Sequence, residues 1–137
     1  MSKNDTCNEN NDTGSSGQTT ALQGKQFSFE TYFGATLVTK DGIKSTKEVL
    51  ADKKYVGIYF SASWCPPCRG FTPLLAEFYE MLQSEDGNED ALEIIFASSD
   101  KDQSEFEAYY KKMPWLSLPF AQRGVKDELS RLFSVRG

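Results

Sequence analysis

Two cysteines flank two prolines in the segment Cys65-Pro66-Pro67-Cys68, and these residue types at this spacing could do redox chemistry. The two sulfurs are close enough to form a disulfide, so one site can hold two electrons as a dithiol and release them as a disulfide. At the start of a helix, Cys65 would face unpaired backbone N–H groups and the positive end of the helix dipole, which favour the thiolate. Because the thiolate is the attacking species in disulfide exchange, the pattern predicts a redox site.

Two other uses of a cysteine pair fit this sequence less well. Tetrahedral zinc takes four ligands, but the chain has no histidine and only one further cysteine, Cys7. A purely structural disulfide would close a very short loop, and short loops restrain the unfolded chain least. We therefore favour redox chemistry at Cys65 and Cys68, and we expect neither a metal nor an organic cofactor.

The motif lies between an apolar segment and an amphipathic one. Residues 55–61 are rich in β-branched and aromatic side chains, which predicts a strand buried on both faces. After the motif, apolar residues recur at helical spacing, which predicts a helix kinked near Pro73. Its inner face is expected to carry Phe71, Leu74, Leu75, Phe78 and Leu82.

The rest of the chain also alternates between strand and helix patterns. Strands are predicted at residues 35–40, 43–44 and 92–97. Helices are predicted at 45–50, 102–113 and 125–133, with 115–120 as a connection. The last two helices are expected to bury Phe106, Tyr109, Tyr110 and Met113, and Val125, Leu129, Leu132 and Phe133, respectively. The alternation indicates an α/β fold, in which right-handed crossovers place the motif at the carboxyl end of a central strand.

Length and charge bound the class of protein. The chain has 137 residues, and residues 1–23 are too polar to bury the surface that folding requires. We predict a disordered tail over 1–23 and one domain over 24–137. The net charge of −5 argues against nucleic acid or an anionic membrane as a partner, and no apolar run is long enough to span a membrane. Without a recognisable signal sequence, a cytoplasmic location is expected.

A longer stretch around the motif resembles a known family. Residues 59–79 read Tyr-Phe-Ser-Ala-Ser-Trp-Cys-Pro-Pro-Cys-Arg-Gly-Phe-Thr-Pro-Leu-Leu-Ala-Glu-Phe-Tyr, and residues 113–120 read Met-Pro-Trp-Leu-Ser-Leu-Pro-Phe. Both resemble the tryparedoxins and nucleoredoxins of the thioredoxin superfamily, and the resemblance runs from about residue 30 to the end. It implies a thioredoxin-like fold with a central mixed sheet flanked by helices. It also implies a thiol–disulfide oxidoreductase that takes electrons from a low-molecular-weight dithiol, such as trypanothione, and passes them to peroxidases and other disulfide-bearing proteins.

The resemblance further implies roles at the motif. Cys65 would attack the partner disulfide, and Cys68 would resolve the mixed disulfide that forms. Trp64 would shield the attacking sulfur and offer a flat contact surface, or it is a core residue at the rim. Pro66 and Pro67 would stiffen the turn and remove two backbone N–H donors near the sulfurs.

Three more residues are candidates for tuning the site or contacting a substrate. Arg69 could lower the pKa of Cys65 or remain a solvated surface charge. Trp115 matches a family position near the site, although an aromatic residue there could equally serve packing alone. Tyr59 stands where thioredoxins carry a buried acid, so Tyr59 or water would have to move the Cys68 proton, if any group does.

The end of the chain departs from the family pattern. Relatives continue after a segment like residues 133–137 with Ile-Pro-Thr, whose proline is cis and faces the disulfide. A β-hairpin and a last helix then follow, and this chain is expected to lack all of them. An exposed strand edge would result, which favours a homodimer through that edge. The alternative to an oxidoreductase is a truncated, catalytically weak or inactive thioredoxin-like module that binds partners.

Overall fold

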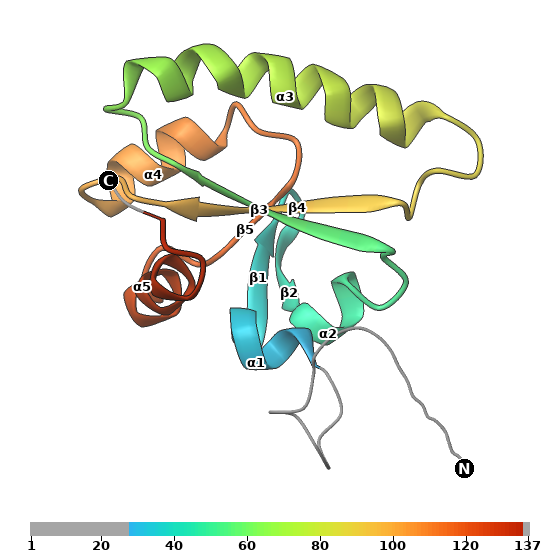
Figure 1. Ribbon diagram of the computed structural model, residues 1–137, viewed down its shortest axis with the longest axis horizontal. Helices are drawn as coiled ribbons and strands as arrows, with labels where there is room; N and C mark the ends of the chain where they lie inside the picture. Colours follow the sequence, from blue (N-terminus) through green and yellow to red (C-terminus); the bar gives the residue numbers. More distant parts are fainter. Residues whose placement is uncertain (1–27, 136–137) are drawn as a thin grey trace.

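The computed structural model describes residues 28–135, which form one mixed sheet with helices on both faces (Figure 1). The tail predicted over residues 1–23 lies outside the described residues. The strands are β1 (Thr36–Thr39), β2 (Gly42–Ser45), β3 (Tyr55–Ser61), β4 (Leu92–Ser98) and β5 (Leu116–Ser117). The helices are α1 (Phe29–Phe33), α2 (Thr46–Val49), α3 (Pro66–Ser84), α4 (Gln103–Tyr110) and α5 (Arg123–Leu132).

The strand order is β2-β1-β5-β4-β3, which puts the shortest strand in the middle of the sheet. β5 pairs in parallel with β4 and antiparallel with β1, where Val38 lies opposite Ser117. The prediction that residues 115–120 are only a connection is therefore wrong. A strand of two residues is too short to show the alternation by which strands are recognised in a sequence.

β3, which leads into the cysteine motif, lies at an edge of the sheet. Among the described strands it pairs only with β4, in a parallel register that runs from Tyr55↔Leu92 to Ser61↔Ser98. Most of its residues are only partly buried, and Tyr55 is 71% exposed. The prediction of a central strand buried on both faces is therefore wrong for β3, although the motif does follow its carboxyl end. β4 is the deeply buried strand of this pair.

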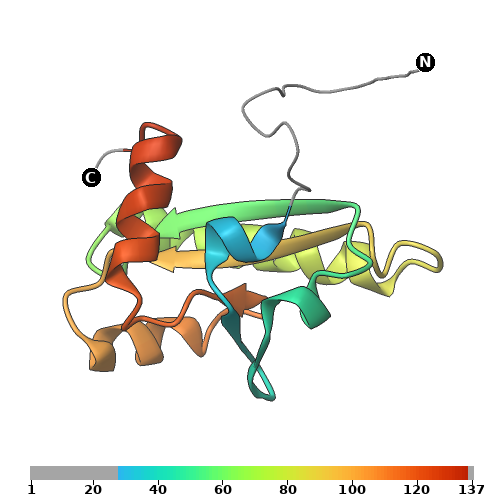
Figure 2. The same cartoon turned by 90° about the horizontal axis from the view of Figure 1, so that it is seen from below.

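β4 divides its side chains between two cores because successive residues of a strand point to opposite faces. Ile94 and Phe96 lie in an aromatic core, which also contains Tyr79, Phe106, Tyr109, Tyr110, Met113 and Trp115. Ile95 and Ala97 lie in an aliphatic-rich core with Phe33, Leu37, Leu50, Leu116, Leu118 and Leu129. Figures 1 and 2 show α3 on one face of the sheet and α1 and α5 on the other.

Helix α3 turns only part of the predicted row inward, because Leu75 packs against the aromatic core and Leu82 is partly buried, but the other three residues are not. Phe71, Leu74 and Phe78 are 49%, 62% and 47% exposed, whereas Thr72 and Tyr79 are buried. Both rows have helical spacing, so periodicity alone cannot rank them. The buried row is the one whose hydroxyl groups find hydrogen-bond partners inside the domain.

The other helices follow the sequence signals more closely. Ser45 and Asp102, the first residues of two predicted helices, cap α2 and α4 and accept hydrogen bonds from the N–H groups three residues on. α3 continues through Pro73. In α5 Leu129 is buried as expected, but the inward placement predicted for Leu132 and Phe133 is wrong, because both are about half exposed beside an apolar cleft.

Candidate active site

The two cysteines lie where β3 gives way to α3. Cys65 is the N-cap of the helix, and its N–H donates to the carbonyl of Ala62 at 3.2 Å. Pro66 and Pro67 are the first two helical residues, which suits proline because its fixed φ matches the first turn. Cys68 follows within the same turn and forms a disulfide with Cys65, their Cα atoms 5.2 Å apart. Both cysteines are partly exposed, so the sulfur pair is accessible to a partner.

The prolines limit the donors available to a thiolate at Cys65. The first N–H groups of a helix have no intrahelical partner, but neither Pro66 nor Pro67 has an N–H. The N–H of Arg69 donates to the carbonyl of Cys65 at 3.0 Å. In the first turn, a negative charge on the Cys65 sulfur can therefore be stabilised by the Cys68 N–H and by the helix dipole.

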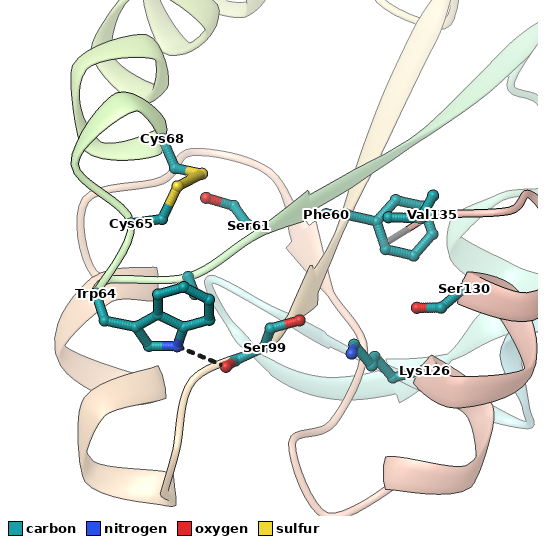
Figure 3. Close-up of a pocket in the computed structure, with 10 residues that line it drawn as sticks. Phe60, Ser61, Trp64, Cys65, Cys68, Ser99, Lys126, Ser130 and Val135 are labelled. Carbon is teal, nitrogen blue, oxygen red and sulfur yellow. Dashed lines mark hydrogen bonds between the residues drawn. A yellow bond between two sulfur atoms is a disulfide. The ribbon is translucent and has the colours of Figure 1, made fainter. Parts of the chain in front are cut away.

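A pocket of about 260 Å³ opens beside the disulfide (Figure 3). Both cysteines, Trp64 and the end of β3 form one side of it. Ser99, Lys126 and Ser130 line it from the β4–α4 loop and α5. These three residues are absent from the predicted site because they reach it only through the tertiary fold, and no local motif marks them.

Trp64 stands at the mouth of the pocket in a fixed orientation. Trp64 is 45% exposed, and its indole N–H donates to the carbonyl of Ser99 at 2.8 Å (Figure 3). One end of the ring is thus tied to the backbone of a neighbouring loop. Its apolar surface lies beside the sulfurs, where a partner would approach.

A buried carboxylate holds the loop that carries Trp64. Asp100 is 5% exposed and accepts hydrogen bonds from the N–H and Oγ of Ser63, at 2.7 and 2.6 Å, and from Ser98 Oγ at 2.6 Å. Arg69 donates from Nη1 to the Ser63 carbonyl at 2.7 Å, so its side chain is bonded to the motif loop. Asp100 is missing from the predicted site because an acid in a polar loop gives no sign of its partners.

Four hydroxyl groups form a continuous hydrogen-bonded chain beneath Cys68. Tyr59 OH lies 2.7 Å from Thr72 Oγ1, which lies 2.7 Å from Tyr109 OH. Tyr109 OH in turn lies 2.8 Å from Ser61 Oγ. Thr72 Oγ1 and Tyr59 OH also contact the Cys68 carbonyl, at 2.9 and 3.3 Å. Burial raises the pKa of Tyr109, so its phenol keeps its proton at neutral pH.

Trp115 lies under the site rather than on its surface. It is fully buried, and its ring makes edge-to-face contacts with Tyr59 and Tyr79, with centroids 5.8 and 5.7 Å apart. Its burial excludes direct contact with a substrate. Its influence on the cysteines can pass only through neighbours such as Tyr59.

Within residues 28–135 there is no group of His, Cys, Asp and Glu side chains that could hold a metal ion. None of the helices in this range is long and apolar enough to cross a membrane. An accessible disulfide at a helix N-terminus, with a rigid scaffold beneath it, is suited to thiol–disulfide exchange.

A sheet with a Cys-x-x-Cys pair at such a strand–helix junction defines a thioredoxin-like class of protein. Residues 52–137 match the family model described as thioredoxin-like. Over 103 residues the chain is 50% identical to tryparedoxin of Trypanosoma brucei brucei, a match that covers 74% of this chain and 67% of the relative. Over 101 residues it is 46% identical to probable nucleoredoxin 1 of Arabidopsis thaliana, covering 74% of this chain and 17% of the relative.

The solved structures that match this chain include tryparedoxins as well. Tryparedoxin from Trypanosoma brucei matches with 45% identity and a TM-score of 0.69, covering 80% of this chain and 73% of that one. Tryparedoxin II complexed with glutathionylspermidine matches with 35% identity and a TM-score of 0.70, covering 80% and 74%. The chain therefore belongs to the thioredoxin-like family, in its tryparedoxin and nucleoredoxin branch, and is a thiol–disulfide oxidoreductase. It spans about two thirds of the tryparedoxin and under a fifth of the nucleoredoxin.

Proposed function

We propose that this protein is a dithiol carrier of the tryparedoxin type, which reduces disulfide-bearing proteins such as peroxidases. The observation that carries the proposal is the accessible Cys65–Cys68 disulfide at the start of α3, beside the pocket bordered by Trp64. The 50% identity to a tryparedoxin supports this type of carrier. The tryparedoxin II complex with glutathionylspermidine supports a low-molecular-weight thiol as the electron source, with the dithiol trypanothione as our candidate.

In the proposed cycle, the Cys65 thiolate attacks a partner disulfide. The partner's S–S bond breaks, a mixed disulfide forms, and the partner's other sulfur leaves as a thiolate that takes up a proton. Cys68 then attacks the Cys65 sulfur, which re-forms the internal disulfide and releases the partner as a dithiol. The small dithiol reduces the internal disulfide by the same exchange. The two sulfurs are sufficient for this cycle without a metal or an organic cofactor. The cycle requires a reducing compartment, for which we propose the cytoplasm.

Reduction of insulin disulfides with dithiothreitol as the electron donor tests the proposal. Once circular dichroism shows that the chain is folded, it should accelerate insulin precipitation, and Cys65→Ser should remove this activity. Cys68→Ser should trap a mixed disulfide that mass spectrometry can detect. Cys7→Ser is the matched control, because it also removes one thiol, and it should retain activity. A folded chain that is inert would contradict the proposal and favour a binding module.

We further propose that two copies of the chain pair through the outer edge of β3. That edge has no partner strand among the described residues, and unpaired strand edges readily pair with other chains. An apolar cleft, lined in part by Val56, Ile58 and Phe133, lies beside it and would be covered by the second copy. Analytical ultracentrifugation should show a dimer that Phe133→Lys weakens. A monomer at high protein concentration would refute the pairing.

A further inference from the structure

We infer that Ser61 forms a hydrogen bond with the Cys68 sulfur in which Ser61 can act either as the acceptor or as the donor. Tyr109 is the positioning residue that permits Ser61 to change from one role to the other. The inference rests on the proposed function, because it concerns the step in which Cys68 resolves a mixed disulfide. It extends the site from the sulfurs to the hydroxyl chain beneath them.

The position of Ser61 suggests this role. Ser61 is the last residue of β3, is 5% exposed and lines the same pocket as both cysteines. Its side chain is directed toward the disulfide (Figure 3). Its hydroxyl is bonded to Tyr109 OH, and Tyr109 is only 3% exposed. Water therefore has little access to the Tyr109 hydroxyl. Whether that hydroxyl donates to Ser61 or accepts from it decides whether the Ser61 proton is free to point toward the sulfur.

Counting protons gives two arrangements of the chain, because each hydroxyl donates one hydrogen bond and accepts up to two. When Thr72 donates to the Cys68 carbonyl, Tyr109 donates to Thr72 and Ser61 donates to Tyr109. A Ser61 lone pair is then left for the sulfur. When Thr72 instead donates to Tyr109 and accepts from Tyr59, Tyr109 donates to Ser61, whose own proton is then left for the sulfur. Only hydroxyl rotations separate the two arrangements.

The two arrangements match the two charge states of Cys68. A thiol can donate its proton to the Ser61 lone pair, and a thiolate can accept the Ser61 proton. In the resolving step Cys68 releases its proton to water in the open pocket, and its thiolate attacks the Cys65 sulfur. The Cys65–Cys68 bond forms, the bond from Cys65 to the partner breaks, and the partner sulfur leaves as a thiolate. A donor to the thiolate lowers the pKa of Cys68 and increases the reactive fraction.

The buried environment of Tyr109 supports its part in this device. Burial raises the pKa of Tyr109, so the phenol remains protonated and can donate as well as accept throughout the working pH range. Other ionisable groups near Cys68 could also contribute to the pH profile of its reaction, so they are left unchanged in the variants below. They are Cys65, Tyr59, Arg69, Asp100 and Lys126.

Stopped-flow oxidation of the reduced chain by dithiobis(nitrobenzoate) separates the two cysteine steps. Attack by Cys65 releases one coloured thiolate, and attack by Cys68 on the resulting mixed disulfide releases a second. The Cys7→Ser background removes the remaining thiol. Ser61→Ala should slow the second phase roughly tenfold at neutral pH, the usual effect of losing one hydrogen bond to a charged group, and should shift its pH midpoint upward. Tyr109→Phe should act in the same direction with a smaller effect, and both should leave the first phase unchanged.

Tyr110→Phe is the matched control, because it also removes a buried phenolic hydroxyl from α4. That hydroxyl donates to the carbonyls of Val38 and Trp115, at 3.2 and 2.6 Å, and takes no part in the hydroxyl chain. Its second phase should keep the wild-type rate, and urea unfolding will show that each variant is folded. A wild-type pH profile for the second phase in Ser61→Ala or Tyr109→Phe would overturn the inference. Absence of both phases in the unsubstituted chain would instead refute the proposed function, and the inference with it.

Discussion

A buried carboxylate lies near each end of β4, and the two differ in the hydrogen bonds that they accept. Asp100, just beyond the carboxyl end, accepts three short hydrogen bonds from Ser63 and Ser98. Two of these bonds hold the loop that leads into the cysteine motif. The charge is thus surrounded by donors at the end of the sheet where the site is built.

Glu93, near the amino end of the same strand, has fewer hydrogen-bond donors around its carboxylate. Its Oε1 accepts from Tyr79 OH at 2.8 Å and from the N–H of Ile94 at 3.0 Å, and Lys53 Nζ lies 4.0 Å from Oε2. Burial raises the pKa of Glu93, and these three neighbours only partly offset that effect. Buried charge therefore has different effects at the two ends of β4. At the carboxyl end Asp100 holds the loop that leads into the cysteine motif, whereas at the amino end the burial of Glu93 costs stability.

Asp100→Asn should have the largest effect of the changes that test this contrast. An amide offers one oxygen where a carboxylate offers two, so at least one of the three donors loses its acceptor. The cost should be about 1–3 kcal/mol, measured by urea unfolding at neutral pH. Asp90→Asn is the control, because this exposed acid pairs with Lys53 at the surface and should change stability by less than about 1 kcal/mol. Equal losses in the two variants would show that the donors around Asp100 add nothing.

Ser98→Ala should have a smaller effect in the same direction. It removes one donor to Asp100 and the acceptor of the Asp100 N–H, but it leaves both bonds from Ser63 in place. A loss of about 1 kcal/mol is expected in the same unfolding assay. Ser84→Ala, which removes an exposed hydroxyl bonded to the Met81 carbonyl, should be close to neutral. If Ser98→Ala lowered the free energy of unfolding more than Asp100→Asn does, Ser98 rather than Asp100 would be the main stabilising residue of this group.

Glu93→Gln should have the smallest effect and the opposite sign. Because its folded pKa is raised, Glu93 is ionised in the unfolded chain at pH values where the folded chain still holds the proton. The stability of the unsubstituted protein therefore falls as pH rises from the unfolded pKa through the folded pKa, and stays low above it. Glutamine can still accept from Tyr79 and cannot ionise, so the variant should be the more stable one at pH 7.5. Urea unfolding at pH 4 and 7.5 should show this advantage growing with pH, and an advantage independent of pH would contradict the explanation.

Features encoded by neighbouring residues were predictable from the sequence. The order of strand, cysteine pair and helix placed Cys65 and Cys68 correctly, since a motif and its helix are adjacent in the chain. The caps Ser45 and Asp102 were predictable for the same reason. The resemblance around the motif identified the fold and the branch of the family, which the comparisons confirm.

The remaining features depend on contacts between distant segments. Ser61 meets Tyr109 across 48 positions, and Ser63 meets Asp100 across 37. Serine and tyrosine suit many environments, so their types do not reveal such pairs. Three of the five residues predicted on the inward row of α3 are exposed, and Thr72 and Tyr79, whose hydroxyl groups have partners in other elements, are buried instead. The edge position of β3 depends on which strands pair with it, and a single strand's pattern does not contain that information.

The two-residue strand β5 has a consequence for how the domain folds. It joins the β1–β2 hairpin to the β3–α3–β4 unit, through the pairs Val38↔Ser117, Ile95↔Leu116 and Phe96↔Ser117. The pairs between β4 and β5 span 21 positions and those between β3 and β4 span 37, whereas Val38 and Ser117 lie 79 positions apart. Because contacts that are distant in sequence form slowly, we expect the pairing of β5 with β1 to form late and to make unfolding cooperative. Without residues 116 and 117 in place, the sheet would open as two separate pieces.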